Sequence, residues 1–207
     1  MLESPGSIAY NGGENAEKGG GGILIPDELL YRRYLDGDDG GLEALMERHG
    51  DRLTLYLDGY LRDIHEAEDV MIEAFAYLVA KKPHIRDGGF RAYLYKAARR
   101  MAFRTLTKRR SALCFSLEEL TAEPEAREMV QETAELAERA EALHAAMAEL
   151  HGDYREALFL VYFEGLSHAE AARVMGKRER QVADLVYRGK KALRRRLEEG
   201  GFCYADN

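Results

Sequence analysis

The stretch Tyr154–Glu199, YREALFLVYFEGLSHAEAARVMGKRERQVADLVYRGKKALRRRLEE, decides the fold of this 207-residue chain. It opens with an apolar helical pattern that Asp153 can N-cap, and Ser167-His168-Ala169-Glu170 is an S-x-x-E capping box that starts a second helix. A break at Gly176-Lys177 is followed by a long, basic helical pattern. Two helices joined by a tight, Gly-containing turn, the second one basic, are typical of a helix-turn-helix that places its second helix in the DNA major groove.

The net charge of −7 conceals a strong segregation of charge along the chain. Residues 173–196 carry ten Lys and Arg against two acids, and residues 95–110 carry seven and no acid. Between these segments, residues 116–142 hold nine Glu against two Arg. Phosphate groups respond to local basic patches rather than to the charge of a whole chain. Two basic patches around an acidic spacer therefore favour a nucleic-acid partner.

Helical periodicity dominates the rest of the chain, and strand signals are scarce, so we predict an all-α protein with two small domains. A helix should begin at Pro26, and others should cover about 42–60, 63–78, 90–104 and the segment ending at 150. We expect a Gly-rich flexible tail over 1–25, a first domain over 26–112, an acidic flexible linker over 113–130, a helix-turn-helix domain over 131–200, and a tail over 201–207.

No segment approaches the ~20 apolar residues that a membrane span needs, and no signal peptide is recognisable, so we expect a cytoplasmic protein without membrane insertion. The two cysteines, Cys114 and Cys203, lack metal-ligand spacing, and the six histidines are scattered. No nucleophile or phosphate-binding loop stands near them. An enzyme has little support, and we expect no cofactor or metal.

Two helical patterns of the first domain each allow two interpretations. Glu66, Asp69 and Glu73 lie at i, i+3 and i+7, which puts three carboxylates on one helix face: either a solvated surface or a docking surface for a basic partner. The basic helix from Phe90 interleaves cations with aromatic rings, a pattern that suits single-stranded nucleic acid. Alternatively the apolar side chains of this helix are core, and we expect this for most of Phe90, Leu94 and Phe103.

Three stretches together resemble bacterial RNA polymerase sigma factors of the extracytoplasmic-function (ECF) type. They are Glu68-Asp69-Val70-x-x-Glu73-x-Phe75, then Phe90-Arg91-Ala92-Tyr93-Leu94-Tyr95-Lys96-x-Ala98-Arg99, and Tyr154-Arg155-Glu156-x-Leu158 through Glu164-Gly165-Leu166-Ser167 to Lys190-Lys191-Ala192-Leu193. The resemblance spans about residues 28–200. Their order and spacing make it specific, although each stretch alone is only moderately so.

The resemblance implies a role for each of these segments. The acidic helix should bind core RNA polymerase through Glu66, Asp69, Val70, Ile72, Glu73 and Phe75. The loop at 83–89 and the helix after it should capture a flipped base and hold the opened strand of the minus-ten element, through Arg86, Asp87, Phe90, Tyr93, Lys96, Arg99, Arg100, Arg104, Lys108, Arg109 and Arg110. The helix-turn-helix should read the minus-thirty-five element through Ser167, Lys177, Arg178, Arg180, Gln181, Ala183, Asp184, Tyr187, Arg188, Lys191 and Arg195.

The sequence also departs from the family pattern. Tyr93 stands where Trp is common, Ile72 where Gln is common and Arg100 where Asn is common, while Asp184 and Gly189 replace the usual small hydroxyl residue and Ala of the reading helix. An acid facing DNA repels phosphate unless it accepts from a cytosine amino group. These changes bear on which promoter is read rather than on the class of protein.

The resemblance implies core polymerase, promoter DNA and a sequestering anti-sigma factor as partners. The alternative from a different class is a DNA-binding regulator that uses only the helix-turn-helix and acts without polymerase. The motifs around Asp69 and Tyr95 argue against it.

Overall fold

The computed structural model describes residues 25–113 and 134–200, and within these residues the chain forms helices joined by turns and irregular loops, with no strand, which confirms the all-α prediction. The first half contains α1 (Asp27–Leu35), α2 (Gly40–Leu61), α3 (Ile64–Lys81) and α4 (Phe90–Leu113). The second contains α5 (Ala134–Ala148), α6 (Gly152–Leu158), the π-helical turn η1 (Phe159–Phe163), α7 (His168–Met175) and α8 (Glu179–Glu199). The predicted tails and almost all of the predicted linker lie outside the described residues.

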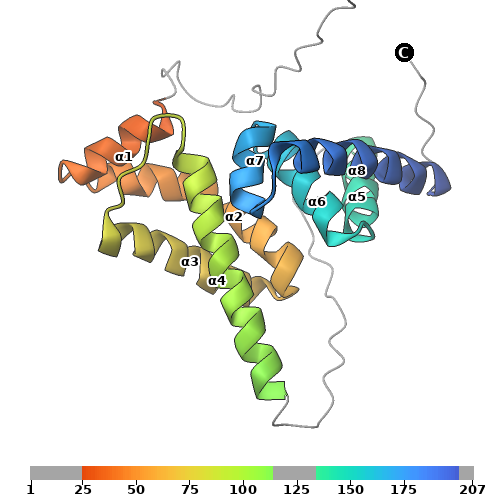
Figure 1. Ribbon diagram of the computed structural model, residues 1–207, viewed down its shortest axis with the longest axis horizontal. Helices are drawn as coiled ribbons and strands as arrows, with labels where there is room; N and C mark the ends of the chain where they lie inside the picture. The colour runs from red at the N-terminus through yellow and green to blue at the C-terminus, as the bar shows by residue number, and fades with distance from the viewer. Residues whose placement is uncertain (1–24, 114–133, 201–207) are drawn as a thin grey trace, which may run out of the picture.

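Helices α2, α3 and α4 pack around a common apolar core, and α1 closes one end of it (Figure 1). Leu53, Leu57, Phe75, Leu78 and Leu94 are all buried there. Helix α4 continues nine residues beyond the predicted end at Arg104, and its last turns extend past the other helices. Phe103 was expected in the core but is 41% exposed, because it lies where α4 leaves the bundle.

Helix α1 is fixed to the bundle by a partly buried ion-pair network around Asp27. Its carboxylate accepts hydrogen bonds from Arg48 at 2.6 Å and from the His49 ring at 2.9 Å. Burial raises the pKa of Asp27, but the hydrogen bonds and charges of His49 and Arg48 outweigh it and hold the pKa below its ordinary value. The Tyr31 hydroxyl adds a hydrogen bond of 2.9 Å to the carbonyl of Pro83, in the loop after α3.

The capping box predicted at the start of α7 is present. The backbone N–H of Glu170 donates to Ser167 Oγ at 3.2 Å, and the backbone N–H of Ser167 donates to Glu170 Oε2 at 2.9 Å. Gly176 then ends α7 in the left-handed conformation, with φ of 67°, where glycine carries no steric penalty. The helix-turn-helix therefore forms as its local signals predict.

The prediction for the helix before it was wrong in two details. His151, not Asp153, is the N-cap of α6: its Nδ1 accepts from the backbone N–H of Asp153, while the carboxylate of Asp153 pairs with Lys177. We also expected this helix to run to Phe163, but residues 159–163 form a π-helical turn, in which the N–H of Glu164 donates to the carbonyl of Phe159.

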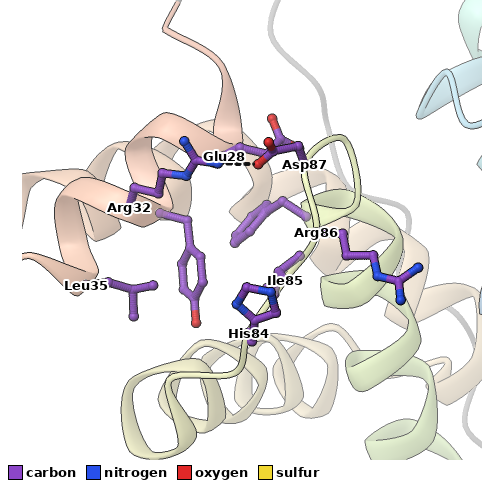
Figure 2. A pocket seen from close by; sticks show the side chains of 9 residues that line it. Glu28, Arg32, Leu35, His84, Ile85, Arg86 and Asp87 are labelled. Atoms are coloured by element: carbon purple, nitrogen blue, oxygen red, sulfur yellow. Dashed lines mark hydrogen bonds and ion pairs between the residues drawn. The ribbon is translucent and has the colours of Figure 1, made fainter.

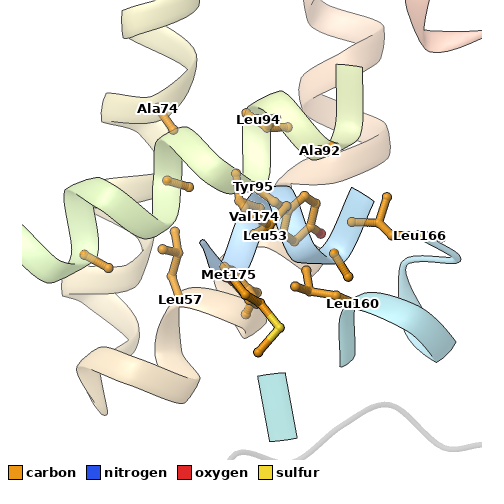
Figure 3. Close-up of a cluster of buried hydrophobic side chains, with 14 of the residues drawn as sticks. Leu53, Leu57, Ala74, Ala92, Leu94, Tyr95, Leu160, Leu166, Val174 and Met175 are labelled. Atoms are coloured by element: carbon orange, nitrogen blue, oxygen red, sulfur yellow. The ribbon is translucent and has the colours of Figure 1, made fainter. Parts of the chain in front are cut away.

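The hydrophobic cores of the two halves are continuous. Figure 3 shows Leu53 and Leu57 of α2 and Tyr95 of α4 facing Leu160, Leu166, Val174 and Met175 of the second half. All seven side chains are buried. The second half therefore packs against the first half through apolar side chains along α2 and α4.

Candidate functional site

The exposed face of α8 carries a row of polar side chains that its own packing leaves free. Arg180, Asp184, Tyr187, Arg188 and Lys191 are exposed, and Tyr187 reaches 73% exposure. Val182 and Val186, on the opposite face, are buried. No ion pair joins these five side chains to any other residue that the structure describes. Ala183, half-buried, flanks this row.

Gly189 lies on the packed face of α8, so it does not belong to the exposed row. A Cβ atom there would lie 3.2 Å from Leu158 Cγ and 3.3 Å from Tyr154 Cβ, both on α6. This departure from the family pattern therefore concerns the close approach of α8 to α6 rather than the choice of base.

Several predicted minus-thirty-five residues have structural partners in the free protein. The Ser167 hydroxyl donates to Glu170 Oε2 at 2.6 Å, and Lys177 Nζ donates to Asp153 at 3.0 Å. The Gln181 amide oxygen accepts from the backbone N–H of Arg178 at 2.8 Å. Arg195 pairs with Glu199 at 2.8 Å on the exposed surface, where such a pair is worth little and opens easily.

The predicted polymerase contacts on α3 divide between its surface and the core. Asp69, Ile72 and Glu73 are exposed, and Ile72 is an apolar side chain with 54% exposure. Val70 and Phe75 are buried, so they hold the face in place rather than meet a partner directly. Glu66 is half-buried and pairs with Arg109 at 3.3 Å.

Most cations of α4 line its exposed side, but Arg91 and Arg99 reach across to the second half. Lys96, Arg100, Arg104, Lys108 and Arg109 are exposed, and Tyr93 is half-buried among them. The side chain of Arg110 lies outside the described residues. Arg99 turns the other way, toward the second half, where its Nε donates to the buried Glu156 at 2.7 Å. No local pattern in the sequence indicates this contact, because the two residues are 57 positions apart.

A pocket of about 330 Å³ lies where the loop after α3 meets the start of α4 and α1 (Figure 2). It brings together Arg86, Asp87 and Phe90 with His84 and Ile85 of the same predicted loop. The α1 residues Glu28, Tyr31, Arg32 and Leu35, which the sequence did not single out, complete it. An ion pair of 2.5 Å between Arg32 and Asp87 spans its rim. Its volume is typical of small-ligand pockets. The floor of the pocket is aromatic, with the ring centroids of Tyr31 and Phe90 5.5 Å apart.

Comparisons with known proteins agree with this architecture. The family model of sigma-70 region 2 matches residues 45–112, and that of sigma-70 region 4 matches residues 140–193. The RNA polymerase sigma-H factor of Pseudomonas aeruginosa is 28% identical over 83% of this chain and 94% of its own length. The ECF RNA polymerase sigma factor SigM of Bacillus subtilis is 26% identical over 77% of this chain and 96% of its own.

A solved structure shares the fold: the sigma factor RpoE of Bartonella quintana, in complex with the anti-sigma factor NepR, superposes with a TM-score of 0.58. It is 20% identical and covers 75% of this chain and 96% of its own. The chain belongs to the sigma-70 family of transcription initiation factors. Within that family it is a sigma factor of the ECF type, which directs promoter-specific transcription. Among the described residues no helix is long and apolar enough to cross a membrane.

Proposed function

We propose that three separate surfaces of this sigma factor divide the work of initiation. The exposed α3 face of Asp69, Ile72 and Glu73 binds core polymerase. The pocket beside Phe90 and the cations of α4 hold the melted minus-ten element, and the exposed row of α8 reads the minus-thirty-five element. The observation that carries the proposal is the pocket, because it lies at the point where the exposed cations of α4 begin.

The α3 face suits a basic partner that also offers an apolar contact. Asp69 and Glu73 are one helical turn apart, with Ile72 beside them, and no cation of the described residues lies within ion-pair distance of either carboxylate. Their charge is therefore available to a partner. Exposed opposite charges steer encounter, and an apolar side chain within the patch supplies burial.

The pocket suits a base that has left the duplex. Extruding a base costs a few kcal/mol, which stacking and edge contacts must offset. Tyr31 and Phe90 lie at the floor of the pocket but are 3% and 0% exposed, so the accessible apolar surface comes from Leu35 and Ile85. Arg32, Arg86 and Asp87 at its sides offer donors and an acceptor. The exposed Lys96, Arg100 and Arg104 then continue along α4, where they can neutralise the phosphates of the opened strand.

The α8 row combines cations with one acid, Asp184. Arg180 and Arg188, one turn on either side of it, can each donate to the two acceptors of guanine. An ionised carboxylate can only accept, and the cytosine amino group is its matching partner in the major groove. We therefore assign Asp184 to a cytosine within the minus-thirty-five element.

Promoter-dependent transcription tests the proposal. Double-stranded templates are selected from a random library by the protein together with purified core polymerase, and then used in run-off assays. The expected result is a discrete transcript that requires both proteins and begins downstream of two separated sequence elements. Sequence-specific duplex binding without polymerase, together with no transcript in its presence, would instead establish the regulator alternative.

An anti-sigma factor is a further proposed partner. The Bartonella quintana relative was solved with one bound. The free α8 row and the free α3 face of this chain need to be kept from DNA and polymerase until they are required. We place the protein in the cytoplasm, where its polymerase acts.

A further inference from the structure

The two halves of the protein are held together by a buried polar contact centred on Glu156 of α6. Glu156 is only 5% exposed. Its Oε1 accepts from Arg99 Nε of α4 at 2.7 Å and from the Tyr56 hydroxyl of α2 at 3.0 Å. Although partial burial of Arg99 favours its neutral form, the charge and hydrogen bond of Glu156 raise its pKa above the ordinary value, so the guanidinium stays charged.

A second polar contact joins the halves beside the first. Arg91 of α4 donates from Nη1 to the carbonyl of Glu164 at 2.6 Å, just before the turn at Gly165. Beneath it, the continuous apolar core covers Leu160, Leu166 and Tyr95. We call the Arg99–Glu156–Tyr56 and Arg91–Glu164 contacts, with this apolar interface, the clasp. The structure with both contacts formed is the closed state.

The closed state is incompatible with simultaneous binding of both promoter elements. Positions minus ten and minus thirty-five are about 25 base pairs apart, or about 85 Å at 3.4 Å per pair. The clasp keeps α4 in direct contact with α6 and α7, and the whole of α8, at 21 residues, is only about 32 Å long. The two DNA-binding halves must therefore separate before one protein can contact both elements of one promoter.

We propose that the clasp is an autoinhibitory contact in which the Glu156 carboxylate takes the place of a DNA phosphate on Arg99. The inference rests on the proposed function, since it needs α4 to be the strand-holding helix. In the closed state Arg99 cannot bind the backbone, because both its charge and its Nε donor are used by Glu156. When the two halves separate, Arg99 becomes free to bind the DNA strand as one more cation. The Glu156 carboxylate becomes exposed to water at the same time.

The substitution Glu156→Gln tests the clasp, because glutamine keeps the size and the acceptor for Tyr56 but removes the charge that holds Arg99. Breaking one member of a buried ion pair strongly disfavours the state that buries it. We expect the variant to be more extended in small-angle X-ray scattering and to bind a single-stranded oligonucleotide about tenfold more tightly. One more neutralised phosphate should steepen its salt dependence, log K against log salt, by about 0.7.

Glu141→Gln is the matched control, because it makes the same charge change at an exposed side chain of α5, a helix that packs mainly against α8. Equal radii of gyration, oligonucleotide affinities and salt slopes for the two variants would overturn the proposal. The double variant Arg99→Glu with Glu156→Arg restores an opposite-charge pair and should return the radius to that of the wild type. A double variant as extended as Glu156→Gln would also count against the clasp.

Circular dichroism and scattering distinguish an unfolded variant from an opened one, and a failure of the clasp from a failure of the proposed function. Helix content from circular dichroism shows whether Glu156→Gln is folded; if it is not, Tyr56→Phe, which deletes only one hydrogen bond of the clasp, replaces it in the same comparison. Scattering reports opening without DNA or polymerase. A wild type that fails in run-off transcription while Glu156→Gln still extends would refute the proposed function and leave the closed state itself supported.

Discussion

Reversing two charges on α3 gives the sharpest test of how this protein meets the polymerase. In the variant Asp69→Lys with Glu73→Lys, two unpaired and exposed carboxylates become cations. Two unit charges 4 Å apart in water attract by about 1 kcal/mol, and reversal turns that attraction into an equal repulsion. The two positions together should therefore weaken binding by about 4 kcal/mol, close to a thousandfold in affinity for core polymerase.

The two substitutions should leave the stability of the fold nearly unchanged. Both side chains lie on the surface of α3, lysine is a good helix former, and surface substitutions away from special contacts change stability by about 0.5 kcal/mol or less. We expect thermal midpoints within a few degrees of each other. Competitive binding to fluorescently labelled core polymerase, at two salt concentrations, measures the affinity, and the loss should shrink at the higher concentration because exposed charges are screened.

Helix α2 offers a matched control. Glu47 and Asp51 are likewise an exposed acidic pair one turn apart, so Glu47→Lys with Asp51→Lys makes the same change in net charge on a different face. It should leave polymerase affinity within a factor of a few of the wild type. If the two double variants lose affinity equally, the attraction depends on net charge alone and the reasoning about the α3 face is wrong.

Three further predictions address single features. Burial raises the pKa of Glu164, which is 1% exposed, so the folded state holds this proton more tightly than the unfolded chain does. The free energy of unfolding should then fall as pH rises from about 4.5 through the raised pKa, and urea denaturation should show that Glu164→Gln removes this fall; parallel curves would contradict it. Arg188→Ala should relax minus-thirty-five base preference in a binding selection, whereas Arg195→Ala should weaken all duplexes about equally; identical profiles would refute that division. Gly189→Leu should lower stability by about 1–3 kcal/mol through overcrowding against Leu158, and an unchanged denaturation midpoint would show that α6 and α8 yield without cost.

Local signals in the sequence account for most of the fold. The capping box of Ser167 and Glu170 lies within one turn, and the apolar periodicity of α2, α3 and α4 requires no distant partner, so both can be recognised from the order of residues alone. The predicted end of α4 falls nine residues short of its observed position, because the last turns carry few apolar residues. The π-helical turn after Leu158 is also missed, because its residues are ordinary helix residues.

The site was harder to predict wherever distant segments meet. Arg99 has the spacing of a DNA-binding cation, and nothing near it in sequence points to Glu156, because their pairing depends on how α4 packs against α6. One wall of the pocket comes from α1, whose Tyr31 and Leu35 have the spacing of ordinary amphipathic residues. Gly189 is a departure from the family in sequence, and only the approach of α8 to α6 explains it.

The π-helical turn at Phe159–Phe163 holds about one residue more than an α-helical turn would. Glu164 and Gly165 follow it, at the point where Arg91 reaches the carbonyl of Glu164. Removing one residue from this turn while restoring α-helical geometry would leave one full turn in place, so the chain beyond it would keep nearly the same orientation. Removing one residue from α6, which is already α-helical, would instead rotate everything beyond it by about 100° and retract it by about 1.5 Å. A change of length is therefore better tolerated in the π-helical turn than in the helix before it.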